Sequence, residues 1–193
     1  RWRRRCHKIV EGSFRQTPVF VSGADADPVF DPGRVLDALA RAMERAGASR
    51  VYVGGAREDD LRLADPGPHA DLQTLLAATR SAAGRGGDVA WVVNDLQVHD
   101  PLLLQRARRF VAGLLRRTGT PAGRLSLDAF AGDYDRLPFG VHRDPAETFL
   151  FGVRGVRRIR LWPGDAFTER VGPDDYQGSL ADAAVYDVGP GDV

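Results

Sequence analysis

The sequence lacks the residues and runs that covalent cross-links and membrane spans require. It has one cysteine, Cys6, among 193 residues, so no disulfide can form within the chain, which fits a reducing cytoplasm. No run of about 18 apolar residues is present, which predicts no transmembrane helix. The first residues also lack the apolar core of a signal peptide. These absences predict a cytoplasmic protein with no membrane partner.

Lysine is also scarce, because Lys8 is the only one and arginine supplies the remaining positive charge. The net charge is +1, which implies no general attraction to polyanions, so nucleic acid is not expected as a partner. The cluster Arg1-Trp2-Arg3-Arg4-Arg5 is either a solvated terminus or a contact for nucleic acid or an acidic partner. A content of 43% hydrophobic and 27% charged residues is ordinary, and the length suits one core in a single domain, 1–193.

The first part of the chain shows the pattern of alternating helices and strands. Asp31-Pro32 and Asp100-Pro101 are helix starts, because aspartate caps a helix and proline suits its first position. The expected elements, in chain order, are a strand over 16–22, a helix from 32 to about 46, a buried strand over 50–54, a loop over 55–68, a helix over 70–83, a buried strand over 89–93, a helix over 101–117, and short strands from 125 onward.

His142 and Asp144 form an H-x-D pair within Phe139-Gly140-Val141-His142-Arg143-Asp144. On an extended strand, side chains alternate with a period of two, so the imidazole and the carboxylate would share one face. Such a pair supplies two of the three ligands in the 2-His-1-carboxylate triad that holds Fe(II) and leaves positions open. Alone, the H-x-D pattern is common by chance.

Two strands, over 147–153 and 157–162, are predicted after the pair, with a turn at Gly155 between them. Arg157 would share a face with Ile159 and Leu161 and so point inward. An inward arginine needs an anionic partner, and its planar fork suits a carboxylate. That partner is either the carboxylate of a cosubstrate or an internal Asp or Glu. Alternatively, the side chain turns outward to solvent.

Together these residues resemble a known family. Gly140-Val141-His142-x-Asp144, then Gly155-Val156-Arg157-Arg158 and Trp162-Pro163, are similar to the JmjC/cupin-type 2-oxoglutarate-dependent oxygenases. Val188-Gly189-Pro190-Gly191-Asp192-Val193 is similar to the turn that precedes the second histidine ligand in that family, and the asparaginyl-hydroxylase branch has a similar sequence there. The ribosomal-oxygenase branch resembles this chain in having arginine at the position of Arg157. The resemblance covers roughly residues 124 to 193.

The resemblance implies a mainly β protein, a double-stranded β-helix (cupin/JmjC jelly roll) with an α/β N-terminal flank over 1–120 and the first part of the β-helix core over 121–193. Fe(II) would be held by His142 and Asp144, and Arg157 would grip the distal carboxylate of 2-oxoglutarate. The third ligand and the last strands are expected beyond Val193. With O₂, such an enzyme hydroxylates its substrate and releases succinate and CO₂.

Several alternatives stay open. Thr148 has the strand parity of His142, so it either donates a hydrogen bond to the cosubstrate or is part of the barrel wall. The substrate is a peptide or protein side chain, or an amino acid or natural-product intermediate. Hydroxylation and demethylation are not distinguished, and a homodimer is possible. The competing functions are a non-catalytic cupin-like binding or regulatory module and a metal-dependent cupin of another reaction class. A kinase is excluded, because Phe149 occupies the position of the asparagine its motif needs.

Overall fold

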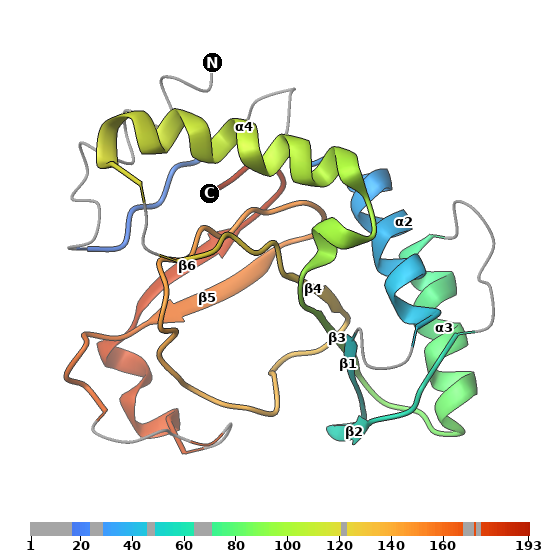
Figure 1. The fold of residues 1–193 in the computed structure, drawn as a ribbon. Coiled ribbons are helices and arrows are strands. Elements are labelled where there is room, and N and C mark those ends of the chain that lie inside the picture. The colour runs from blue at the N-terminus through green and yellow to red at the C-terminus, as the bar shows by residue number, and fades with distance from the viewer. Residues whose placement is uncertain are drawn as a thin grey trace. The chain divides into compact units, whose positions relative to one another are not determined.

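The computed structural model of the chain describes residues 17–23, 29–45, 49–63, 71–120, 123–167, 172 and 175–193 (Figure 1). The chain divides into two compact units. The sheet unit takes its described residues from Phe30–Arg108 and Ala122–Leu137. The ribbon-pair unit takes its described residues from Arg1–Val29, Arg109–Pro121 and Pro138–Val193. Each unit thus combines segments from both sides of residue 120, where the sequence had placed the start of the β-helix core.

The sheet unit contains a four-stranded antiparallel sheet in the order β2-β1-β3-β4. Its strands are β1 (Ser49–Val53), β2 (Ala56–Glu58), β3 (Val89–Val93) and β4 (Ala129–Gly132). All residues of β3 are buried, which explains why its sequence is a continuous apolar run without alternation. The two strands predicted here are confirmed as β1 and β3, but only β3 is buried throughout, since in β1 only Val51 and Val53 are buried. Part of the predicted loop over 55–68 forms β2.

Two helices complete this unit; the first begins at Pro32, as predicted, and the second begins at Leu72, two residues after its predicted start. In α2 (Pro32–Met43) the Asp31 carboxylate accepts a hydrogen bond from the Arg34 backbone N–H at 2.9 Å. In α3 (Leu72–Ala83) the chain ends the helix at Gly84, whose φ of 64° is the left-handed conformation that glycine adopts easily. One core joins these helices to the sheet, and its buried members are Met43, Val51, Val53, Leu63, Leu75, Leu76, Val89 and Trp91.

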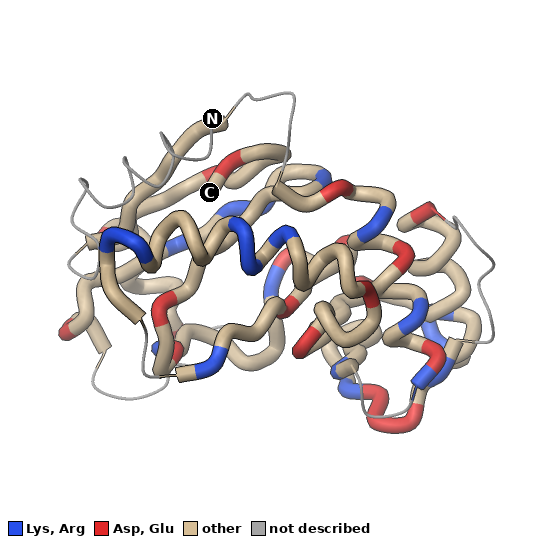
Figure 2. Tube along the Cα trace, turned by 45° about the horizontal axis from the view of Figure 1, so that its top comes forward, with Lys and Arg blue, Asp and Glu red and all other residues tan. Residues whose placement is uncertain are grey.

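The longest helix is α4 (Pro101–Thr118), close to the predicted 101–117. A short 3-10 turn, η1 (Leu96–Val98), precedes it. The arginines of α4 are blue along the helix in Figure 2. In the ribbon-pair unit, Phe110 of α4 meets the rings of Phe149 and Phe151 edge to face, at centroid distances of 5.3 and 5.0 Å. Among the described residues, no helix is long and apolar enough to cross a membrane.

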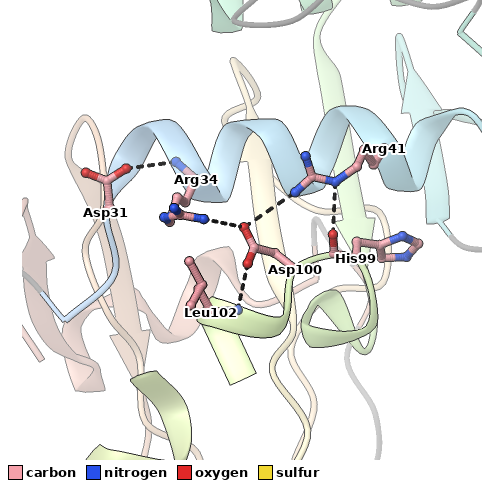
Figure 3. Close-up of polar contacts among 6 residues, drawn as sticks. All are labelled: Asp31, Arg34, Arg41, His99, Asp100 and Leu102. Atoms are coloured by element: carbon pink, nitrogen blue, oxygen red, sulfur yellow. Dashed lines mark hydrogen bonds and ion pairs between the residues drawn. The ribbon is translucent and has the colours of Figure 1, made fainter. Parts of the chain in front are cut away.

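Asp100 ties the start of α4 to α2 within the sheet unit (Figure 3). Its carboxylate accepts a hydrogen bond from the Leu102 backbone N–H at 2.7 Å, which caps α4. The other oxygen lies 3.2 Å from an Arg34 nitrogen and 3.5 Å from an Arg41 nitrogen. Arg41 also donates to the His99 carbonyl at 2.9 Å. The buried carboxylate therefore has a partner for each oxygen.

The ribbon-pair unit contains two antiparallel strands, β5 (Arg157–Leu161) and β6 (Ala184–Val188), and a 3-10 helix η2 (Gln177–Asp182). The chain bends before β5 at Gly155, whose φ is 68°, but this bend does not join two strands, because residues 147–153 form no strand. Strand β5 corresponds to the second of the two strands predicted after the His142–Asp144 pair.

The turn over 189–193 is held by hydrogen bonds to the backbone of two other segments, residues 21–23 and Gly152. Val21 and Val193 exchange two backbone hydrogen bonds of 2.7 and 3.1 Å, and the Gly191 N–H donates to the Gly152 carbonyl at 2.9 Å. The Asp192 carboxylate accepts hydrogen bonds from the Gly23 N–H at 3.0 Å and from the Gly189 N–H at 2.9 Å. In this chain, the Pro-Gly-Asp turn is therefore a structural clamp.

Three strand predictions are wrong. Residues 142–156 form no regular strand, and only an isolated bridge occurs at Val141. Pro145 has no N–H to give to a ladder, and the aromatic side chains of 149 and 151 pack on α4. Residues 17–22 of the predicted early strand form no strand beyond the Val21–Val193 pairing, and Gln16 lies outside the described residues.

The described strands form a four-stranded and a two-stranded sheet, and no closed barrel is present in these parts of the chain. The double-stranded β-helix therefore stays a prediction. The predictions made for Cys6 and for the arginine cluster over 1–5 fall outside the described residues.

Candidate functional site

The loop that carries the H-x-D pair is shaped by Gly140, whose φ is 63°. This left-handed residue turns the chain so that its own carbonyl lies 3.1 Å from Nδ1 of His142. The ring of Phe139 meets the imidazole edge to face at 5.2 Å. A carbonyl partner at Nδ1 requires a proton on that nitrogen, which leaves Nε2 with a free lone pair in the neutral ring.

His142 and Asp144 meet directly. Nε2 of His142 lies 3.4 Å from Oδ1 of Asp144, and the two side chains are 40% and 54% exposed. The predicted proximity of the two groups is thus present, although a loop, not a regular strand, brings it about. The same carboxylate is approached by Oγ1 of Thr148, at 3.5 Å from its Oδ2.

The spacing of the pair suits two ligands of one metal ion. Two donors bound at about 2.1 Å and at right angles are separated by about 3 Å. The 3.4 Å between Nε2 and Oδ1 is close to that value. A metal-bound histidine ordinarily donates its other N–H to a carbonyl or carboxylate, as Nδ1 can to Gly140. The two residues therefore fit a metal ion as a partial ligand set.

The described residues do not complete that set. Nowhere among them do three or more His, Cys, Asp or Glu side chains gather in a way that could hold a metal ion. A shallow, open hollow lies beside the pair, lined by residues 144–147. Any ion held here would thus face solvent from the side of this hollow and would need at least one further donor.

Arg157 lies on β5, in register with Val188 of β6. It is half-buried, as is Ile159, while Leu161 on the same face is exposed. The neighbouring Arg158 points to the other face and forms a two-point ion pair with Asp187, at 2.8 Å for each contact. The alternation predicted for this strand is therefore present at its start. The anionic partner proposed for Arg157 stays a prediction.

Two features of the site were not predicted from the sequence. The carbonyl of Gly140 orients the imidazole, and the guanidinium of Arg143 donates to the carbonyl of Gly164. The second contact ties the loop to the segment after β5. Backbone carbonyls carry no side-chain signature, so only the glycine, which permits the left-handed turn, could have pointed to the first contact.

Comparison with known proteins adds no family: no family model, no curated protein and no solved structure matches the chain.

Proposed function

We propose that the chain is an Fe(II)- and 2-oxoglutarate-dependent oxygenase that hydroxylates a peptide or protein side chain or a small amino-acid-like substrate. One observation carries the proposal. Nε2 of His142 lies 3.4 Å from Oδ1 of Asp144, while the Gly140 carbonyl engages the other ring nitrogen. An imidazole with a carbonyl at one ring nitrogen and a carboxylate near the other, at the spacing of adjacent ligands, is the arrangement that a facial iron site needs.

Each residue has a defined task in this proposal. His142 and Asp144 hold the metal, and Thr148, at 3.5 Å from the carboxylate, restrains its rotation. Arg157 pairs with the distal carboxylate of 2-oxoglutarate, for which a guanidinium fork is suited. Bound iron with its cosubstrate supplies the oxidising chemistry, and the protein's contribution is to bind, orient and limit water.

A second candidate is a non-catalytic binding module that uses the same loop. The observation that favours it is exposure: side chains 40% and 54% open to solvent do not exclude water from a reaction. Among the described residues no third donor joins the pair either. A metal-dependent enzyme that needs no 2-oxoglutarate is a third candidate, and it gives no task to Arg157.

The first test is succinate formation from 2-oxoglutarate by the purified full-length protein with Fe(II) and ascorbate. His142→Ala and Asp144→Asn should each reduce turnover to background. Asp165→Asn, which removes an exposed carboxylate from the same unit, should leave turnover unchanged. Calorimetric titration with Mn(II) measures metal binding independently of activity. The two site variants should abolish this binding.

Arg157→Ala separates the oxygenase from other metal enzymes. Loss of a charge-assisted, two-point contact should raise the 2-oxoglutarate requirement at least about tenfold while Mn(II) affinity stays the same. Absence of both turnover and Mn(II) binding in the unmodified protein would reject the enzyme and leave the binding module.

A further inference from the structure

Helix α4 carries positive charge without any negative charge. Its 18 residues include five arginines, Arg106, Arg108, Arg109, Arg116 and Arg117, and no Asp or Glu. A solvated helix face commonly alternates charges of both signs, which support one another across one turn. This helix lacks such compensation within itself.

Helix stability explains only part of this pattern. Arg116 and Arg117 lie in the last turn, where cations interact favourably with the helix dipole. Arg106 and Arg109 lie in the middle of the helix and are three residues apart, so they repel each other weakly. The residues one turn away from Arg109 are Gln105 and Gly113, and neither offers a negative charge.

Three of these arginines share one exposed face. At about 100° per residue, Arg106, Arg109 and Arg116 fall within an arc of about 80°, and at about 1.5 Å per residue they span about 15 Å along the axis. All three are exposed, and no ion pair with another described residue engages them. Because α4 is one continuous helix, its own geometry sets these spacings. We call these three residues the arginine stripe.

We propose that the arginine stripe binds the phosphodiester backbone of a double-stranded nucleic acid. Guanidinium groups pair with phosphate oxygens at two points, and a rigid helix presents them at fixed spacing. A stripe of about 15 Å matches the axial rise of about four nucleotides of one strand, at about 3.4 Å each. Ala112 and Gly113 lie between Arg109 and Arg116 and are too small to hold a backbone away.

An anionic membrane is the weaker candidate for the same charges. A helix that lies on a membrane inserts an apolar face beside its basic one. The apolar face of α4 is already used within the protein, since Leu103, Ala107, Phe110 and Leu114 are all buried. What remains for a partner is charge, small residues and Leu102, the one large hydrophobic side chain of α4 that is exposed. A single exposed leucine beside three arginines suits a phosphate backbone better than the interior of a membrane.

The net charge of +1 does not contradict a local site. Charges separated by more than about 10 Å are largely screened at 0.1 M salt, so a phosphate on the stripe responds mainly to the stripe. The same reasoning predicts modest affinity and strong dependence on salt.

The test is the anisotropy of a fluorescein-labelled 20-base-pair DNA duplex, and of the RNA duplex of the same sequence, between 50 and 300 mM KCl. Three contacts predict a slope of log affinity against log salt of about −2.7 for DNA. Arg109→Gln/Arg116→Gln should reduce that slope by about 1.8 and weaken binding about 60-fold at 0.1 M KCl.

Two control variants separate the stripe from charge in general. Arg108→Gln removes a charge from the same helix but about 120° away from the centre of the stripe. Arg62→Gln/Arg154→Gln removes two exposed charges elsewhere, matching the stripe variant in net charge. Both should change affinity by less than about threefold. Circular dichroism and melting temperature should show that all variants stay folded.

Binding of one duplex or of both supports the proposal and identifies whether DNA or RNA is the source of the phosphates. Three results overturn it: no binding to either duplex at 50 mM KCl, equal losses in the stripe variant and the Arg62/Arg154 control, or stripe-dependent binding only to vesicles that contain phosphatidylserine.

Discussion

The carboxylate of Asp100 should stabilise the sheet unit through two separable effects, a helix cap and a charge. Its side chain is 6% exposed, whereas those of Arg34 and Arg41 are 48% and 45% exposed. Ion pairs to half-exposed arginines contribute little, about 0.5 kcal/mol each. The hydrogen bond from Leu102 N–H is a true N-cap, and such a cap contributes about 1 kcal/mol.

These contributions predict different costs for two substitutions. Asp100→Asn keeps an oxygen for the cap and removes the charge, so it should lower the free energy of unfolding by about 1 kcal/mol. Asp100→Ala removes both and should cost about 2 kcal/mol. In 1 M NaCl the charge effect is screened, so the cost of Asp100→Ala should fall to about 1 kcal/mol.

Urea unfolding followed by tryptophan fluorescence measures these costs. Trp91 is fully buried in the core of the sheet unit, and replacing Trp2 and Trp162 by phenylalanine makes it the sole reporter. Asp88→Ala, which removes an exposed carboxylate near the start of β3, should change stability by less than about 0.5 kcal/mol. Equal costs for Asp100→Asn and Asp100→Ala, or a cost for alanine that is unaffected by salt, would refute the division into cap and charge.

Two further predictions concern the close contact between Gly152 and Gly189 and the dependence of stability on the ionisation of Asp133. A Cβ at Gly152 would lie 1.8 Å from the carbonyl oxygen of Gly189, so Gly152→Ala should destabilise the ribbon-pair unit by at least about 2 kcal/mol, measured by hydrogen exchange. Burial opposes ionisation of Asp133, but hydrogen bonds from the Val89 N–H and from Arg80 outweigh it and lower the pKa below 3.8. The unfolded state therefore takes up the proton first, so this stabilisation, complete above about pH 5, is lost as pH falls through the lowered pKa. Asp133→Asn should flatten the dependence of the urea midpoint on pH below 4.

Local signals predicted the helices and the buried strands well. Asp31 and Asp100 cap the helices that the two Asp-Pro pairs predicted, and Gly84 ends α3 in the left-handed conformation. Each of these signals acts within one turn of the chain, so no tertiary knowledge is needed to interpret it. The apolar run of β3 was similarly unambiguous, because a strand buried on both faces shows no alternation.

Strand pairing after residue 141 could not be predicted in this way. Alternation of Phe149 and Phe151 with their neighbours is compatible with an extended chain, but whether such a chain joins a sheet depends on a partner far away in sequence. Here the two rings pack on Phe110 instead. Strand β5 does find a partner, β6, and that pairing places Arg157 opposite Val188.

The candidate site shows the same division between local and distant information. A separation of two residues keeps the two side chains within reach of each other in an extended or looped backbone, but not in a helix. His142 and Asp144 therefore meet although no regular strand carries them. Orientation of the imidazole is different, because it depends on a carbonyl exposed by the left-handed Gly140. A third metal donor would come from a distant segment, which no spacing rule predicts.

The two proposals make independent demands on the protein, and this independence strengthens their tests. His142→Ala removes a proposed metal ligand without altering the charge of α4, so it should leave duplex affinity unchanged. Arg109→Gln/Arg116→Gln removes charge from α4 without altering a donor atom of the loop, so succinate formation from 2-oxoglutarate alone should continue. If duplex affinity fell in the first variant or basal turnover fell in the second, the loss would report damage to the fold and not to a site. If instead His142→Ala affects only succinate formation and Arg109→Gln/Arg116→Gln affects only duplex affinity, each loss is due to the substituted side chains.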